Sequence, residues 1–201
     1  MNPRVLIALV LVCAAAFAAI LVAATSVDEE APTTDGQRRF EGATLPEDLA
    51  TPDFDLTDQN GESVAMRDLR GRPVIVTFLY TSCEDSCPSQ AQQVRAALDE
   101  LGEDVPALAV AVDPPRDTRA SARSFLADQK LTGRMRFVLG TRDELERVWK
   151  DFGVQPQRED LEHTARLVLV DPEGAQRVSY PLDQITPERL AHDLRLLDAG
   201  A

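Results

Sequence analysis

The sequence predicts an α/β fold, in which helices pack on a sheet. Two observations support this prediction. Strand-like and helix-like segments alternate over most of the chain, and two of the strand-like segments are apolar along their whole length, as buried strands are. Of the 201 residues, 44% are hydrophobic and 27% are charged, so the chain can bury a core of its own.

The strands are predicted from apolar runs and turn signals. Residues 53–56 form a short strand that leads into residues 58–61, whose Asn-Gly pair is typical of a hairpin. Residues 74–80 are rich in β-branched and aromatic side chains and predict a buried central strand, and residues 105–112 predict a second one. Further strands are expected at residues 135–139, 166–170 and 176–180.

The predicted helices are marked by the residues at their ends. Residues 88–101 form a helix that stops at Gly102. The next helix runs to about residue 130, and either Asp117 or Thr118 caps its start. Two more helices are expected after the capping residues Thr141, with Glu144 completing a capping box, and Thr186.

The charge of the chain excludes one class of function. Lysine and arginine, 21 together, are outnumbered by 34 aspartate and glutamate residues, and the formal net charge is -13. A protein that grips a phosphate backbone needs a basic surface. We therefore expect no nucleic-acid partner.

The N-terminal residues predict a single-pass membrane anchor. Residues 5–24 contain no charge, glycine or proline, and at about 1.5 Å per residue such a helix spans the roughly 30 Å of a bilayer core. Arg4 precedes the run and Asp28 follows it, so the positive-inside rule places the remainder of the chain on the extracytoplasmic (periplasmic) side of the cell membrane. The alternative is a cleaved signal peptide, whose apolar region is usually shorter.

These features divide the chain into three parts. Residues 1–26 are the uncleaved anchor. Residues 27–50 are rich in acidic residues, proline and glycine and show no apolar periodicity, which is typical of a flexible linker. Residues 51–201 form the α/β domain.

Two of the three cysteines lie where an α/β fold usually carries its site. Cys83 and Cys87 follow the strand at residues 74–80, and sites gather beyond the carboxyl ends of strands. At a helix start, the helix dipole is expected to lower the pKa of the Cys87 thiol. The spacing of the pair allows a disulfide or a shared metal ion, and the simplest alternative is two structural cysteines. A thioredoxin motif has two residues between its cysteines and this pair has three, which leaves metal binding open.

A third ligand is expected elsewhere, because two sulfurs rarely complete a metal site. Of the only two histidines, His163 lies just before the strand at residues 166–170, where a loop could bring it over the cysteines, and His192 is interpreted as an ordinary side chain of the last helix. Two thiolates and an imidazole suit Cu(I), whereas structural zinc prefers four ligands. Acidic residues that could support the ligands are Asp85, Asp113 and Asp117, although a strand end and a helix cap explain the last two more simply.

Four segments carry a resemblance to a known family. They are residues 78–88 (Phe-Leu-Tyr-Thr-Ser-Cys-Glu-Asp-Ser-Cys-Pro), residues 112–118 (Val-Asp-Pro-Pro-Arg-Asp-Thr), the pair His163 and Thr164, and residues 169–174 (Leu-Val-Asp-Pro-Glu-Gly). In order and spacing they resemble the Sco/SenC copper proteins of respiratory membranes. One departure is Glu84, where that family usually has a proline, and it affects the stiffness of the loop rather than the ligands.

The resemblance implies a fold, a metal and a function. The fold is thioredoxin-like, with a central mixed sheet, flanking helices and a hairpin insertion. The metal is copper, as Cu(I) with Cu(II) left open, held by Cys83, Cys87 and His163. The function is that of a metallochaperone that helps to assemble the binuclear copper centre of cytochrome c oxidase. Its partners would be the copper-accepting oxidase subunit, a copper donor or thiol reductant, and the membrane.

The alternative function is enzymatic. In a thiol:disulfide oxidoreductase, Cys83 and Cys87 would be a redox-active pair that reduces the cysteines of the oxidase copper site or acts as a redox sensor. His163 separates the two functions, because copper delivery needs it as a ligand and disulfide exchange does not.

Overall fold

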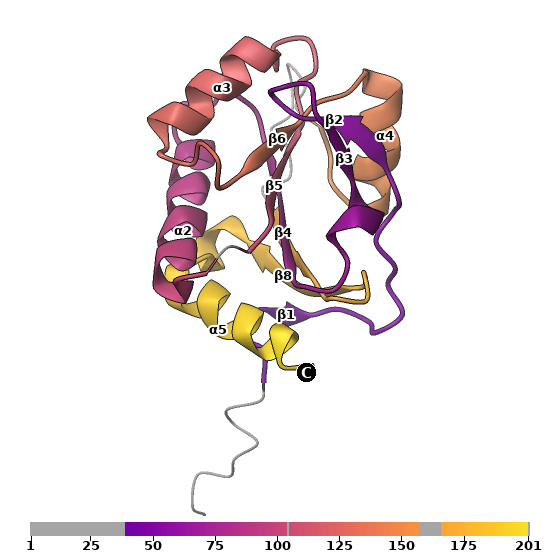
Figure 1. Cartoon of the computed structure of the whole chain (residues 1–201), viewed down its shortest axis with the longest axis vertical. Coiled ribbons are helices and arrows are strands. Elements are labelled where there is room, and N and C mark those ends of the chain that lie inside the picture. Colours follow the sequence, from indigo (N-terminus) through magenta and orange to yellow (C-terminus); the bar gives the residue numbers. More distant parts are fainter. Residues whose placement is uncertain (1–38, 104, 157–165, 201) are drawn as a thin grey trace, which may run out of the picture. The chain divides into compact units, whose positions relative to one another are not determined.

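A six-stranded mixed sheet with the strand order β1-β8-β7-β4-β5-β6 lies at the centre of the fold (Figure 1). The computed structural model describes residues 39–103, 105–156 and 166–200. β4 is parallel to β5 and antiparallel to β7, which makes the sheet mixed. The strands are β1 (Ala43–Thr44), β4 (Val74–Leu79), β5 (Ala107–Ala111), β6 (Arg136–Val138), β7 (Arg166–Val170) and β8 (Gln176–Pro181).

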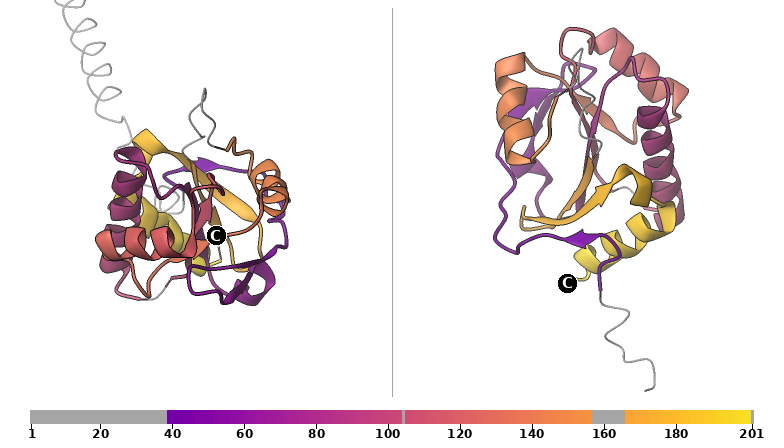
Figure 2. Two further views of the ribbon diagram at one scale, coloured as in Figure 1. Left: turned by 90° about the horizontal axis from the view of Figure 1, so that it is seen from above. Right: turned by 180° about the vertical axis from the view of Figure 1, so that it is seen from behind.

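Helices cover both faces of this sheet (Figures 1 and 2). α2 (Ser86–Leu101) packs against α5 (Pro187–Asp198) on one face, together with α3 (Arg119–Asp128), and α4 (Arg142–Asp151) lies on the other. Alternate residues of β4 serve the two faces: Thr77 receives a hydrogen bond from Gln90 of α2, and the Phe78 ring packs 5.3 Å from that of Phe152 at the end of α4. The predicted α/β fold with flanking helices is confirmed.

The predicted capping residues are found at the helix ends, and the structure decides between the two candidate caps of α3. Thr118, and not Asp117, caps α3, because its hydroxyl accepts the Ser121 N–H in a capping box. The Thr141 and Glu144 capping box starts α4 as predicted. Gly102 ends α2 in the left-handed conformation that the absence of a Cβ permits.

The predicted hairpin forms a small second sheet of β2 (Asp55–Thr57) and β3 (Ser63–Ala65), followed by the 3-10 helix η2 (Met66–Leu69). The buried Asp58 carboxylate organises its turn by accepting the N–H groups of Asn60 at 2.8 Å and Glu62 at 3.0 Å. The same carboxylate pairs with Arg136 of β6 at 2.9 Å. These contacts fasten the hairpin to the edge of the main sheet. A further 3-10 helix, η3 (Leu182–Gln184), follows β8.

The first described residues pack closely against β8. Residues 43–44, which composition assigns to the linker, form β1 and pair with β8. The fully buried Asp193 carboxylate accepts the N–H groups of Glu41 at 2.8 Å and Gly42 at 3.0 Å, and it also accepts the Tyr180 hydroxyl. The predicted anchor lies outside the described residues. Among those that are described, no helix is long and apolar enough to cross a membrane.

We predict that Gly42→Ala lowers the stability of the domain. A Cβ at Gly42 would lie 2.4 Å from the Val178 side chain and 2.7 Å from the Tyr180 ring, so β1 must move away from β8. Overpacking of this kind costs about 1–3 kcal/mol, measurable by denaturant unfolding. Ala43→Ser on the same strand is the control, since Ala43 is exposed. Equal stability of the two variants would contradict the close packing.

Candidate functional site

The two cysteines lie where β4 is followed by α2, as the sequence predicts, with Cys83 in the connecting turn and Cys87 in the first turn of the helix. The sheet continues just past β4, where the Val112 N–H donates to the Leu79 carbonyl, and the chain then leaves the sheet at Tyr80. α2 begins at Ser86, two residues earlier than predicted, so that Cys87 belongs to its first turn. Both thiols are free and buried.

Hydrogen bonds hold the Cys83 sulfur against the first turn of α2. The Cys87 N–H donates to the Cys83 sulfur at 3.1 Å, and the Cys83 sulfur lies 3.3 Å from the Ser86 hydroxyl. The Cys83 N–H in turn donates to the Tyr80 carbonyl at 3.3 Å, which closes the turn. Ser86 was not among the predicted site residues, and its capping-type side chain one residue before Cys87 was the signal in the sequence.

The thiols have opposite acidities. Burial raises the pKa of the Cys83 thiol, but hydrogen bonds from the Cys87 thiol, the Ser86 hydroxyl and the Cys87 N–H outweigh burial and bring this pKa below its ordinary value. Burial, together with the hydrogen bond that its thiol donates to Cys83, raises the pKa of Cys87 far above its ordinary value. The predicted lowering of the Cys87 pKa by the helix dipole is therefore wrong, because Cys87 is only 1% exposed and Cys83 receives its amide.

A buried aspartate connects the cysteine turn to the end of β5. The Asp117 carboxylate accepts the Thr81 N–H at 2.7 Å, the Thr81 hydroxyl at 2.9 Å and the Asp113 N–H at 3.0 Å. Burial raises the pKa of Asp117 to about 6. Asp113 accepts a hydrogen bond from the exposed Arg116 at 2.5 Å. Neither aspartate touches a cysteine in these contacts, so both support the loops around the sulfurs.

Asp85 and the two histidines were also considered in the sequence. Asp85 is exposed at the start of α2 and its side chain makes no capping hydrogen bond. His192 lies half-buried on α5. His163 falls in residues 157–165, outside the described residues. Within the described part of the chain, no three histidine, cysteine or acidic side chains form a cluster that could hold a metal.

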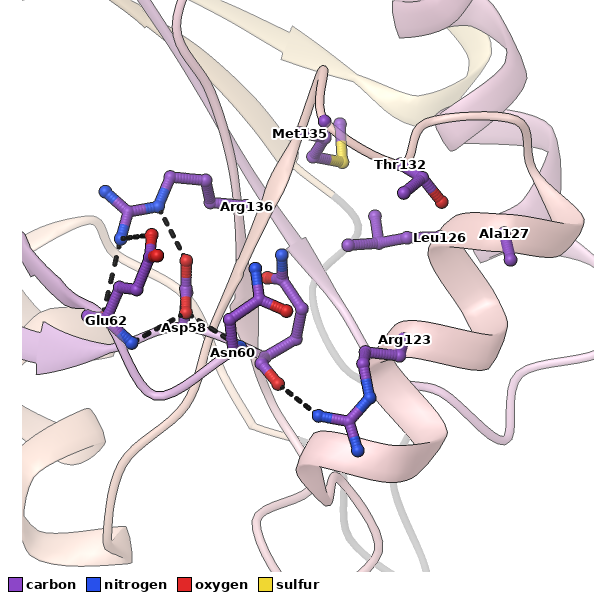
Figure 3. Close-up of a pocket in the computed structure, with 11 residues that line it drawn as sticks. Asp58, Asn60, Glu62, Arg123, Leu126, Ala127, Thr132, Met135 and Arg136 are labelled. Carbon is purple, nitrogen blue, oxygen red and sulfur yellow. Dashed lines mark hydrogen bonds and ion pairs between the residues drawn. The ribbon is translucent and has the colours of Figure 1, made fainter.

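A pocket of about 560 Å³ lies elsewhere, between the hairpin turn, α3 and the start of β6 (Figure 3). Neither cysteine lines it. Arg123 donates across it to the Gln59 carbonyl at 2.7 Å, and Asp58 and Arg136 pair at its other side. Because these polar groups bind one another, we interpret the pocket as a seam between the hairpin and the main sheet.

The fold and the site define a class: a thioredoxin-like protein with two converging thiols at the carboxyl end of its central strand. The SCO1/SenC family model matches residues 42–197. The chain therefore belongs to the SCO1/SenC family.

Relatives of known structure and name agree with this assignment. The copper-bound structure of ScoI from Bradyrhizobium japonicum is 31% identical, has a TM-score of 0.63, and its match covers 74% of this chain and 99% of that one. A Stutzerimonas stutzeri protein with "copper-binding" in its name is 30% identical, covering 66% of this chain and 70% of that protein. The human mitochondrial SCO1 homolog is 29% identical over 60% of this chain, which spans 44% of the human protein.

We predict that alkylation separates the two cysteines. At neutral pH a larger fraction of Cys83 than of an ordinary cysteine is thiolate, because its pKa is lowered, whereas Cys87 stays protonated. Iodoacetamide should therefore label Cys83 first, and labelling of Cys83 should slow only as the pH falls through that lowered pKa. Peptide mass spectrometry after timed quenching measures both rates. Faster labelling of Cys87 would contradict the assignment of the two thiols.

Proposed function

We propose that this chain is a membrane-tethered copper-binding protein of the Sco type, which takes part in assembling the binuclear copper centre of cytochrome c oxidase. The observation that carries the proposal is the contact between the Cys83 sulfur and Cys87 at the end of β4, on a SCO1/SenC scaffold. Oxidase assembly follows from the family resemblance. Copper binding is supported by two relatives of at least 30% identity, one with copper bound and one with copper binding in its name.

The donor atoms fit copper. Thiolate sulfur is a soft ligand, and soft ligands select Cu(I). The Cys83 sulfur already accepts the Cys87 N–H, so we expect that a shared ion requires little movement of the turn. A third ligand is needed, and we assign it to His163, whose imidazole would complete a low-coordinate set.

Loading the site requires the chain to release protons. The pKa of Cys83 is already lowered, since hydrogen bonds from the Cys87 thiol, the Ser86 hydroxyl and the Cys87 N–H outweigh its burial. Cys87 is held protonated by burial, and its proton must leave as the metal takes its place beside the sulfur. Copper affinity is therefore expected to rise with pH. A disulfide between the two residues has no thiolate to offer, so loading requires the reduced pair.

The tether would place this site at the membrane. We propose that residues 1–26 anchor the chain, that residues 27–50 supply an acidic linker up to the start of the domain, and that the domain lies on the extracytoplasmic side of the cell membrane. The acceptor would be the copper-binding subunit of the oxidase. A copper donor or a thiol reductant would be needed to load the protein again.

The alternative function, thiol:disulfide exchange, is favoured by the asymmetry of the pair. A thiol with a lowered pKa beside a second thiol that burial keeps protonated suits an attacking and a resolving cysteine. On this alternative the pair would reduce the cysteines of the oxidase copper site, and His163 would be dispensable.

The His163→Ala variant tests which function operates. Loss of a ligand should weaken Cu(I) retention at least about 10- to 100-fold, the range that follows even from changes to groups behind the ligands, and oxidase assembly should fail with partial rescue by added copper. Chelator competition and oxidase activity in a deletion strain measure the two effects. His192→Ala is the matched control. Normal oxidase assembly with His163→Ala, combined with failure of Cys83→Ser and Cys87→Ser, would establish thiol exchange instead.

A second prediction concerns the tether. The full chain should remain with the membrane fraction after a carbonate wash, and a reporter fused after Ala201 should be active only outside the cytoplasm. Charge substitutions within residues 5–24 should release the protein, because a charge at the bilayer centre is costly. A soluble mature form that begins near Thr25 would show a cleaved signal peptide and contradict the anchor.

A further inference from the structure

Asp117 occupies a position that its own local structure does not explain. Capping of α3 is done by Thr118, so Asp117 is not needed to start that helix. Asp117 is 6% exposed, and among the described residues no lysine or arginine forms an ion pair with its carboxylate. The neighbouring Arg116 pairs with Asp113 instead. Burying a carboxylate without a cation is costly unless hydrogen bonds replace its water.

Within the described residues, the hydrogen bonds of the Asp117 carboxylate join two loops. One oxygen accepts both the N–H and the hydroxyl of Thr81, and the other accepts the N–H of Asp113 at the end of β5. The Asp117 backbone is itself fixed, because its N–H donates to the Asp113 carbonyl at 2.9 Å. The carboxylate thus ties the start of the cysteine turn to a rigid strand end.

The position of Cys83 depends on the contact between Asp117 and Thr81 more than the position of Cys87 does. Cys87 is positioned by the first turn of α2 and by burial against the core. Cys83 lies in the turn, two residues after Thr81, and is held by its N–H to the Tyr80 carbonyl and by the contacts of its sulfur. Movement of Thr81 would therefore displace Cys83 relative to Cys87.

We propose that Asp117 is a positioning residue that acts through Thr81 to hold the Cys83 sulfur against Cys87. It does not touch the sulfurs. Asp117 would raise the effective concentration of one cysteine sulfur at the other, and this concentration governs any reaction that closes a ring through both sulfurs. Formation of the disulfide and chelation of one copper ion both close that ring, so both should weaken when the tie is lost. Only the copper half of this inference rests on the proposed function.

The test uses the full-length chain in detergent, with the variants Asp117→Asn, Thr81→Val and the double variant. Thr81→Val removes one hydrogen bond to Asp117 without changing any charge. Asp171→Asn is the control, since Asp171 is equally buried and accepts the Ala175 N–H at 2.7 Å, but in the turn between β7 and β8. It differs from Asp117 in its ion pair with Arg177 at 3.2 Å.

Two equilibria are measured on each protein. In the first, the dithiol transfers two electrons and two protons to glutathione disulfide, giving the protein disulfide and two glutathione molecules. In the second, a chromogenic chelator competes for Cu(I). Asp117→Asn should lower both equilibrium constants by a similar factor of about ten, equal to about 30 mV for the disulfide. Thr81→Val should lower both by a smaller factor, and Asp171→Asn should change neither.

The outcomes distinguish positioning of Cys83 from an effect of the Asp117 charge and from a failure of the variants to fold. A change with Asp117→Asn and none with Thr81→Val would assign the effect to the charge of Asp117 and overturn the proposal. So would a double variant in which the two factors simply multiply, because the residues would then act independently. If Asp117→Asn does not fold, Thr81→Val alone decides. If the unaltered protein binds no Cu(I), the proposed function fails, and the disulfide equilibrium still tests the positioning role.

Discussion

The hydrogen bond from the Cys87 N–H to the Cys83 sulfur is the interaction on which this site depends. It exists because a fully buried strand, β4, ends at Leu79 and the chain must turn within a few residues to begin α2. The turn brings a loop cysteine to the amide end of the helix while the other cysteine is buried in its first turn. The lowered pKa of Cys83 and the raised pKa of Cys87 both follow from this arrangement.

The rest of the structure fixes the ends of that turn. On one side, β4 is held between β5 and β7, and its side chains pack into both layers of the core. On the other side, Asp117 ties Thr81 to the end of β5, and α2 packs against α5. Asp58 fastens the hairpin beside the edge strand β6, and Asp193 holds the chain that leads into the other edge strand, β1. The site is therefore a short turn whose two ends are fixed by the strand and by the helix.

Most of the fold could be predicted because its signals are local. Apolar runs marked the strands, threonine caps marked α3, α4 and α5, and Gly102 marked the end of α2. β1 was assigned to the linker because its pairing depends on Gly42 fitting against Val178 and Tyr180, residues far away in the sequence. The cysteine pair could be predicted from its place after a strand. The pKa values of the two thiols could not be predicted, because burial outweighs the helix dipole at Cys87. The contact between Asp117 and Thr81 could not be predicted either, because 36 residues separate the two in the sequence.

The central claim is that the reduced cysteine pair holds copper and the oxidised pair does not. The most direct measurement is the Cu(I) stoichiometry of the full-length protein, prepared once as the dithiol and once as the disulfide, under competition from the same chelator. The account predicts stoichiometric, thiolate-ligated copper for the dithiol, recognised by its X-ray absorption spectrum, and loss of that copper for the disulfide. Equal retention of Cu(I) by both forms would contradict ligation by Cys83 and Cys87.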